Sequence, residues 1–206
     1  MLLNKGVFNV KICVYGAASA AIDEIYVRLG EELGEKMAKR GHGLVFGGGN
    51  NGMMGAVARG VKENGGYVCR IAPTFFDVDG ALFEDCDEIY SPHTMRERKQ
   101  MLDEMSEAFI VTPGGIGTYE EFFEILSSKQ LGRHGKAIAL LDAEGYFEKF
   151  GELIDHLVEH SFIVPEVKSF YKVFTSVDDL LDYIEGYVPK IVNPSYTRHI
   201  NEMLEK

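Results

Sequence analysis

The sequence is poor in cysteine, in positive charge and in long apolar runs, and each shortage excludes a class of protein. Its three cysteines, Cys13, Cys69 and Cys86, form no CxxC pair and lie in or beside apolar runs, which is typical of buried free thiols in a reducing compartment. The net charge is −11 at pH 7, whereas a protein that binds nucleic-acid backbones needs a basic surface. A small anionic ligand remains compatible with this charge, because backbone amides bind phosphate locally.

Metal-ligand spacing and membrane-spanning segments are also missing from the sequence. His156 and His160 are four residues apart without a surrounding HExxH pattern, which favours a solvated helix face over a zinc site. No stretch approaches the ~20 apolar residues that a membrane span requires. Lys11 interrupts the apolar N-terminal run, so this run predicts a first strand and not a signal peptide. We therefore expect a cytoplasmic protein with no membrane or nucleic-acid partner.

Apolar runs alternate with helical patterns along the chain. The residue patterns predict strands at 10–16, 43–49, 67–73, 87–91, 108–115, 136–142 and 170–175. They predict helices at 21–41, 53–66, 94–106, 118–132, 146–160 and 177–185. Such alternation indicates an α/β fold, a single Rossmann-like, doubly wound parallel sheet with helices on both faces. No break in composition divides residues 1–206, so we expect one domain with a core at about 10–185 and a charged tail at 189–206.

Three glycine-bearing turns, at residues 15–19, 46–55 and 112–118, follow predicted strands and precede predicted helices. Ligands of open α/β sheets bind at the carboxyl ends of the strands, and a glycine turn before a helix offers free N–H groups to phosphate. The second turn matches GxGxxG, but the next strand carries Arg70 where a dinucleotide site needs an acid. No GxxxxGK[ST] motif is present. The turns therefore predict a phosphate site that belongs neither to dinucleotide-binding nor to P-loop proteins.

The predicted helix at 94–106 places an arginine on its apolar face. Met95, Arg98, Leu102 and Met105 are spaced by three, four and three residues and share one face. Spacing alone leaves two interpretations of Arg98 open. Its head group either reaches solvent past an apolar stem or points into the cleft at the strand ends, where it would bind an anion. Lys99 falls on another face, which favours a solvated side chain that is still able to reach a phosphate.

Glu121 also has two interpretations. Thr118 and Glu121 form the T-x-x-E pattern of a capping box, in which the glutamate reaches back to the N-terminal N–H of its helix. On local pattern alone this capping role is favoured. If the glycine turn binds an anion, however, the same N–H groups are occupied, and Glu121 is left free to face the ligand.

Three motifs resemble those of a known family. PGGIGTYEE, which ends at Glu121, fits PGGxGTxxE, and MRERK at 95–99 fits MxxRK. FGGGNNGMMGAVA at 46–58 resembles the glycine-rich stretch of the same proteins. In this respect the chain is similar, over about residues 10–185, to the LOG family of cytokinin-activating nucleoside 5′-monophosphate phosphoribohydrolases, also labelled lysine decarboxylases.

The resemblance implies hydrolysis of the N-glycosidic bond of AMP or of N6-substituted cytokinin nucleotides, which gives a free base and ribose 5-phosphate. It implies no cofactor and no metal, and an assembly of two or more copies. The essential arginine and glutamate of the family match Arg98 and Glu121. The residues expected to bind the substrate are Gly47, Gly48, Gly49, Met95, Lys99, Gly114, Gly115, Ile116, Gly117 and Thr118.

The chain also departs from the family pattern and leaves an alternative open. Many plant relatives have an acidic substrate contact after the third strand, where this chain has Gly80 flanked by Asp77 and Asp79. Lysine decarboxylation is disfavoured, because no nearby lysine has an evident setting for a Schiff base with pyridoxal phosphate. A nucleotide-binding or carrier protein without catalysis would use the same glycine turns, and it is the alternative hypothesis.

Overall fold

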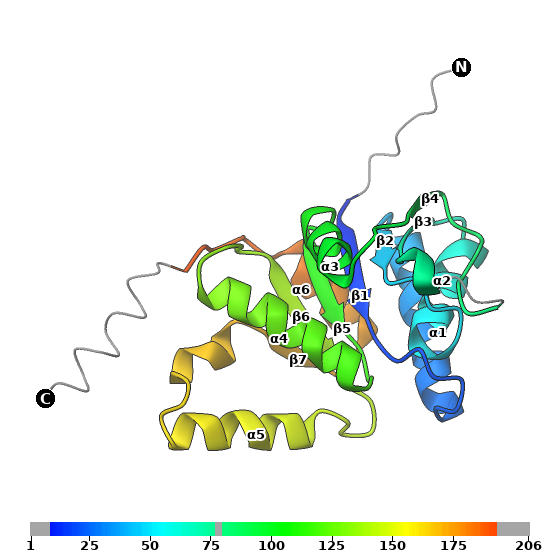
Figure 1. Ribbon diagram of the computed structural model, residues 1–206. Helices are drawn as coiled ribbons and strands as arrows, with labels where there is room; N and C mark the ends of the chain where they lie inside the picture. Colours follow the sequence, from blue (N-terminus) through cyan, green and yellow to red (C-terminus); the bar gives the residue numbers. More distant parts are fainter. Residues whose placement is uncertain (1–8, 77–79, 193–206) are drawn as a thin grey trace, which may run out of the picture.

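The computed structural model describes residues 9–76 and 80–192, and strands and helices alternate along them (Figure 1). The strands are β1 Lys11–Tyr15, β2 Gly43–Phe46, β3 Tyr67–Ile71, β4 Glu88–Tyr90, β5 Ala108–Val111, β6 Ala137–Leu141 and β7 Lys172–Phe174. The α-helices are α1 Glu24–Lys39, α2 Gly52–Glu63, α3 Met95–Glu104, α4 Ile116–Gln130, α5 Glu148–Glu159 and α6 Val177–Glu185. Each predicted strand and helix is confirmed, with small shifts at the ends. Short 3-10 helices, η1 Thr74–Phe76 and η2 Pro165–Ser169, complete the described elements.

The strands form one sheet in the order β4-β3-β2-β1-β5-β6-β7, and every pairing in it is parallel. Strands β1 to β4 follow one another from the centre of the sheet to one edge. The chain then crosses back to the centre, and β5 to β7 follow one another to the other edge. The predicted doubly wound topology is therefore confirmed. The order reverses between β1 and β5, and a crevice at such a reversal is where open α/β sheets bind ligands.

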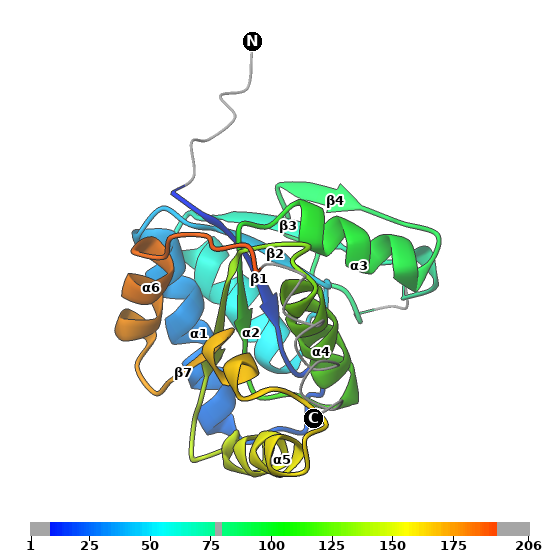
Figure 2. The ribbon, with the colours of Figure 1, turned by 90° about the vertical axis from the view of Figure 1, so that its left-hand side faces the viewer.

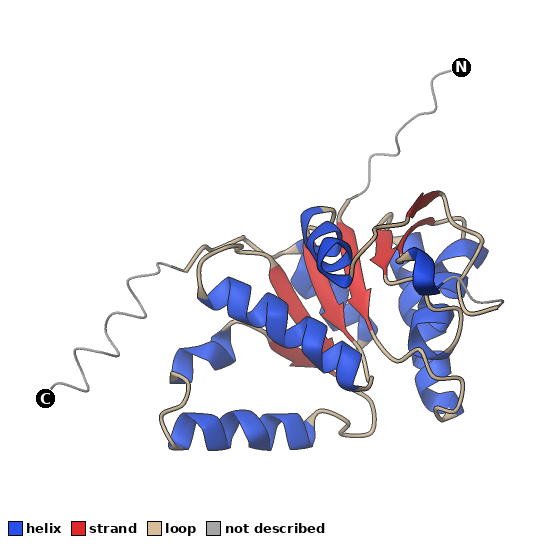
Figure 3. Ribbon diagram, in the orientation of Figure 1, coloured by secondary structure: helices blue, strands red, loops and turns tan. Residues whose placement is uncertain are grey.

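Helices cover both faces of the sheet (Figures 2 and 3). One apolar core joins the sheet to α1, α2 and α6, and a second joins it to α3, α4 and α5. Side chains of β1 alternate between the two cores, with Ile12 and Val14 in the first and Cys13 and Tyr15 in the second. This alternation follows from the two-residue period of a strand. Both faces are covered, which explains why the central strands β2, β5 and β6 are buried along their whole length.

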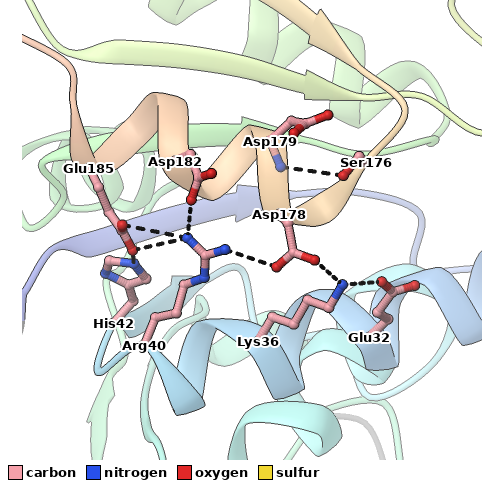
Figure 4. A network of polar contacts seen from close by, with 9 residues as sticks. All are labelled: Glu32, Lys36, Arg40, His42, Ser176, Asp178, Asp179, Asp182 and Glu185. Carbon is pink, nitrogen blue, oxygen red and sulfur yellow. Dashed lines mark hydrogen bonds and ion pairs between the residues drawn. The ribbon is translucent and has the colours of Figure 1, made fainter.

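A network of ion pairs joins α1 to α6 on the first face (Figure 4). The guanidinium of Arg40 lies 2.8 Å from Asp178 and 2.5 Å from Asp182, and Lys36 contacts the same Asp178 at 2.7 Å. Single surface pairs contribute little to stability, but several charges that share partners fix two helices relative to each other. These shared ion pairs therefore hold α1 against α6 on the first face of the sheet.

None of the helices in the described parts of the chain has the length and apolar character of a membrane span. Asp77, Asp79 and most of the predicted tail, residues 193–206, lie outside the described residues.

Candidate functional site

The three glycine-bearing turns meet at the reversal of strand order. The turn after β1 contacts the turn after β5, because the N–H of Ala17 donates to the carbonyl of Pro113 at 3.1 Å. The same turn contacts the start of α2, since the N–H of Met54 donates to the carbonyl of Ala17 at 3.2 Å. Thr112 Oγ1 also donates to the carbonyl of Tyr15 at 3.0 Å. These bonds bring the three turns that the sequence singles out to one place.

A cleft opens above these turns, and two adjoining cavities of about 370 and 330 Å³ form it. Both cavities are lined by Ala18, Met54, Phe76 and Arg98, so they are continuous with each other. The combined volume falls within the range of small-molecule sites.

The first cavity is lined by the start of α4. Gly115, Gly117 and Thr118 line it together with Glu121. The N-cap of α4 is Gly115, and no side chain within the described residues bonds to this helix start. The first N–H groups of a helix have no intrahelical partner and carry the positive end of its dipole. This end of the cleft is therefore suited to a phosphate group.

The second cavity is mainly apolar. Its lining residues are Ala18, Gly47, Gly49, Met54, Phe75, Phe76, Ala81, Leu82 and Arg98. The rings of Phe75 and Phe76 meet edge to face, with their centroids 4.9 Å apart. Aromatic rings beside glycines offer flat apolar surfaces, which suit a planar heterocycle.

Arg98 and Glu121 form a buried pair in the wall of the cleft. Arg98 Nη1 donates to Glu121 Oε1 at 2.8 Å, and the two residues are only 5% and 8% exposed. The Nε of Arg98 donates to the carbonyl of Ile71 at the end of β3, at 3.3 Å. Gly47 packs against the same guanidinium, and a Cβ added there would lie 2.0 Å from Nη2. The arginine on the apolar stripe of α3 thus points into the cleft, and its solvated alternative is wrong.

The environment of Glu121 perturbs its acidity. Burial raises the pKa of this carboxyl, and the nearby Arg98 opposes the rise but leaves the pKa above its ordinary value. A carboxylate held in this way is poorly solvated, so it interacts strongly with any positive charge that develops in the cleft. Shifted acids in clefts are typical of reactive sites.

The structure corrects the capping interpretation of Glu121. The sequence pattern predicts that this helix begins at Thr118, but α4 begins at Ile116 with Gly115 as its N-cap, so Thr118 lies inside the helix and is not the N-cap. Glu121 instead pairs with Arg98, which is 23 residues away in the chain. A capping box does exist at the start of α3, where Thr94 Oγ1 accepts from the N–H of Glu97 and the Glu97 side chain accepts from the N–H of Thr94. The same T-x-x-E pattern in the sequence could have located it.

The remaining predicted residues are distributed around the cleft. Met95 lines the first cavity but is 36% exposed, so the apolar stripe of α3 is not buried at this end. Lys99 does not line either cavity of the cleft. It is half-buried between α3 and α4 and pairs with Glu120 and Glu124 at 2.5 and 2.8 Å. Lys99 also lines a third cavity, of about 220 Å³, together with Glu121. Its side chain is therefore ion-paired and only partly open to solvent.

Gly48, Gly114 and Ile116 are not among the residues that line the two cavities. Gly48 has a φ of +92°, which favours glycine, and it packs on the side chain of Arg70. It therefore determines the shape of the turn after β2 without lining the cleft. A Cβ on Gly114 would lie 2.1 Å from Thr118 Oγ1 and 2.9 Å from the backbone N of Ala17, so this glycine permits the close approach of the first and third turns. Ile116 is 91% exposed.

Several residues that line the cleft are not among the site residues that the sequence predicts. Met54, Phe75 and Phe76 line the cleft, and so do residues 17–19 of the first turn. Phe75 and Phe76 lie in η1, in the connection that begins at the end of β3, and that position after a strand end is the signal that could have indicated them.

Comparisons with known proteins agree with this architecture. A family model described as "Possible lysine decarboxylase" matches residues 54–184. A cytokinin riboside 5′-monophosphate phosphoribohydrolase of Arabidopsis thaliana is 34% identical over 180 residues, which cover 87% of this chain and 84% of that protein. A second Arabidopsis thaliana protein of the same description is 33% identical over 179 residues, or 87% of this chain and 78% of its own length.

Solved structures match the fold at lower sequence identity. The molybdenum cofactor binding protein of Rippkaea orientalis has a TM-score of 0.63 and 20% identity, with 85% of this chain and 95% of that chain covered. The molybdenum cofactor carrier protein of Chlamydomonas reinhardtii has a TM-score of 0.62 and 23% identity, with coverage of 84% and 94%. At these identities the matches show a shared fold alone.

Proposed function

The chain belongs to the family whose model is described as "Possible lysine decarboxylase", the LOG family, and from this premise we propose that it hydrolyses adenine-type nucleoside 5′-monophosphates. The bond that breaks is the N-glycosidic bond, and the products are a free base and ribose 5-phosphate. The observation that carries the proposal is the buried Arg98–Glu121 pair, which lies in the cleft between a helix start suited to phosphate and an apolar cavity.

The arrangement of the cleft suggests how each part of the nucleotide binds. The 5′-phosphate sits at the start of α4, on the N–H groups beside Gly115, Gly117 and Thr118. The base lies in the apolar cavity against Phe76. The ribose then lies beside Glu121. Binding of the phosphate, which is remote from the N-glycosidic bond, helps to position that bond for cleavage.

Glu121 and Arg98 supply the chemistry in this proposal. Cleavage passes through a ribosyl cation with oxocarbenium character, and the ionised Glu121 carboxylate stabilises that positive charge. The electrons of the C1′–N bond leave with the base, water adds its oxygen to C1′, and a proton of that water ends on the base. Arg98 orients Glu121 through the 2.8 Å hydrogen bond and adds positive charge near the anionic substrate.

Lysine decarboxylation, the activity in the description of the family model, receives no support from the lysines. Pyridoxal chemistry needs a lysine in the cleft, and none of the residues lining the two cavities is a lysine. Burial lowers the pKa of Lys129 to about 8, but its ammonium donates to the carbonyl of Lys136 and to Tyr187 Oη. Incubation with lysine and pyridoxal phosphate should therefore yield no cadaverine, and cadaverine formation would contradict this assignment.

A nucleotide carrier without catalysis would use the same cleft, so the test of function must separate binding from cleavage. Purified protein is incubated with AMP and with N6-substituted AMPs, and the mixtures are separated by chromatography. We expect free base to accumulate with time and enzyme concentration. Recovery of intact nucleotide that co-purifies with the protein would favour the carrier.

We also propose that the protein is cytoplasmic and assembles as a homodimer or a larger homo-oligomer. The three cysteines are free, and Cys13 and Cys69 are buried, as expected in a reducing compartment. Phe75 and Phe76 line the cleft and are exposed apolar side chains, which is compatible with a covering partner copy. Sedimentation should give a multiple of the 23.0 kDa chain mass, and a monomer would contradict the assembly.

A further inference from the structure

Helix α5 ends in two histidines and a glutamate whose side chains meet at the surface. His156, Glu159 and His160 each offer one ligand atom, and these atoms all lie within 4.8 Å of one another. The imidazole rings of His156 and His160 are in contact, with their centroids 4.4 Å apart. No residue of α5 lines the two cavities of the cleft, so this cluster is separate from the proposed reaction.

The three side chains are available to a ligand. All three are exposed, and none forms a hydrogen bond or ion pair with another residue in the described part of the chain. Neighbouring acids of α5 are different, since Glu152 pairs with Lys149 and Asp155 pairs with Lys168. The cluster thus keeps its donor atoms free where nearby carboxylates are already neutralised.

Helix geometry explains why the three donors converge. Residues at positions i, i+3 and i+4 share one face of a helix, and His160 caps α5 with its N–H bonded to the carbonyl of His156 at 3.1 Å. The cluster therefore lies at the carboxyl end of the helix, where the dipole is negative and favours a cation.

The spacing of His156 and His160 without an HExxH pattern favours a solvated helix face, but the structure adds Glu159 as a third donor beside them. From this geometry we infer that the three side chains form a binding site for a divalent transition metal ion of the zinc class. Two imidazole nitrogens and one carboxylate oxygen are a donor set that Zn²⁺ accepts, with the fourth position left to water or to a further ligand. Nitrogen and oxygen ligands lie about 2.0–2.2 Å from zinc. The exposed side chains reach these distances by rotating about their side-chain bonds. Mg²⁺ and Ca²⁺ prefer oxygen ligands and are excluded by the imidazoles.

Zinc binding to the full-length chain tests the inference. The tag-free protein is dialysed against ZnCl₂ in the presence of excess MgCl₂, and bound zinc is measured per chain. The test variant is the double substitution His156→Ala with His160→Ala. The matched control is His93→Ala, since His93 is an exposed histidine outside the cluster. We expect one zinc ion per chain in the wild type and in the control, and loss of that ion in the double variant.

Glu159→Gln tests the third ligand separately. The amide keeps the size of the side chain but removes its charge, so zinc affinity should fall below that of the His93→Ala control. A zinc-dependent rise in Tm should accompany binding in the wild type and vanish in the double variant, because a ligand that binds only the folded state stabilises it. The inference is overturned by an unloaded wild type, by equal zinc in the double variant, or by unchanged affinity in Glu159→Gln. Base release from AMP reports on the cleft alone, so its failure is distinguishable from any of these results.

Discussion

The side chains of Glu121 and Arg98 bond across the fold and not within their own helices. Each is buried, and the 2.8 Å hydrogen bond between them, together with the bond from Arg98 Nε to the carbonyl of Ile71, offsets part of the loss of hydration. Buried ion pairs contribute little net stability, because desolvation offsets their attraction. A pair of this kind at the floor of a cleft is therefore better explained by a role in binding and chemistry than by a role in folding.

The acidity of Glu121 should appear in the pH dependence of base release. Burial raises the pKa of its carboxyl above 4.5 in spite of Arg98, and charge stabilisation requires the ionised form. We therefore expect kcat/KM to fall as the pH is lowered through a value above 4.5. A profile measured with AMP from about pH 4 to pH 8 covers this range.

Glu121→Asp is the control for that profile. The phosphate of the substrate also titrates near pH 6, but it does so equally with both proteins. A difference between the two acid limbs therefore belongs to residue 121. Identical limbs would contradict the assignment of this titration to Glu121.

Gly47→Ala should reduce activity while leaving the fold intact. An added Cβ would lie 2.0 Å from Arg98 Nη2, and the end of a flexible side chain yields more readily than backbone. Arg98 should then move away from Glu121, and a displacement of ~1 Å costs about a hundredfold in rate. Steady-state kinetics and thermal unfolding measure the two effects.

The matched control for Gly47→Ala is Gly151→Ala in α5, where an added Cβ meets nothing within 4 Å. This variant should keep wild-type activity. If both alanine variants are equally active, Gly47 does not position Arg98.

At the scale of elements, α3 and α4 show what local sequence can and cannot predict. Both helix starts carry T-x-x-E, yet only Thr94 and Glu97 form a capping box. Glu97 is exposed and reaches back to its own helix, whereas Glu121 is buried against an arginine from a different helix. A pattern of four residues cannot separate these outcomes, because the competing partner comes from tertiary structure.

The strands and the glycine turns of the cleft could be predicted from the sequence, and the physical reasons are plain. The strands were predictable because buried parallel strands are continuously apolar, and the turns because glycine interrupts such runs. Phe75, Phe76 and Met54 were harder to predict, since an apolar side chain in the core and one in a cleft have the same local pattern. The ion-paired setting of Lys99 depends on Glu120 and Glu124 of the facing helix, which spacing within α3 does not reveal.

The capping box of α3 should be important for stability. Thr94→Ala removes the oxygen that accepts from the N–H of Glu97 at 3.1 Å, and losing such a cap costs about 1 kcal/mol. Urea unfolding measures the change. Ser127→Ala, an exposed position on α4, is the control and should change the free energy of unfolding by less than about 0.5 kcal/mol. Equal free energies for the two variants would contradict a stabilising cap at Thr94.

For the whole molecule, the topology explains how a protein of net charge −11 can offer a site for an anion. The reversal between β1 and β5 opens a crevice, and the start of α4 supplies backbone N–H groups there. Local amides therefore act against the overall charge. The cleft joins a cavity at the start of α4, which includes Glu121, to a second and mainly apolar cavity.

The central claim is that this cleft cleaves the N-glycosidic bond of a nucleoside 5′-monophosphate with Glu121 as its charge-stabilising group. The most direct measurement is the release of adenine and ribose 5-phosphate from AMP by the wild type and by Glu121→Gln, with AMP binding measured for both proteins. We expect equal amounts of the two products from the wild type. In the variant we expect a rate lower by about 10²–10³-fold with AMP still bound. Wild-type protein that binds AMP without cleaving it, or a variant as fast as the wild type, would contradict the proposed role of Glu121 in this cleft.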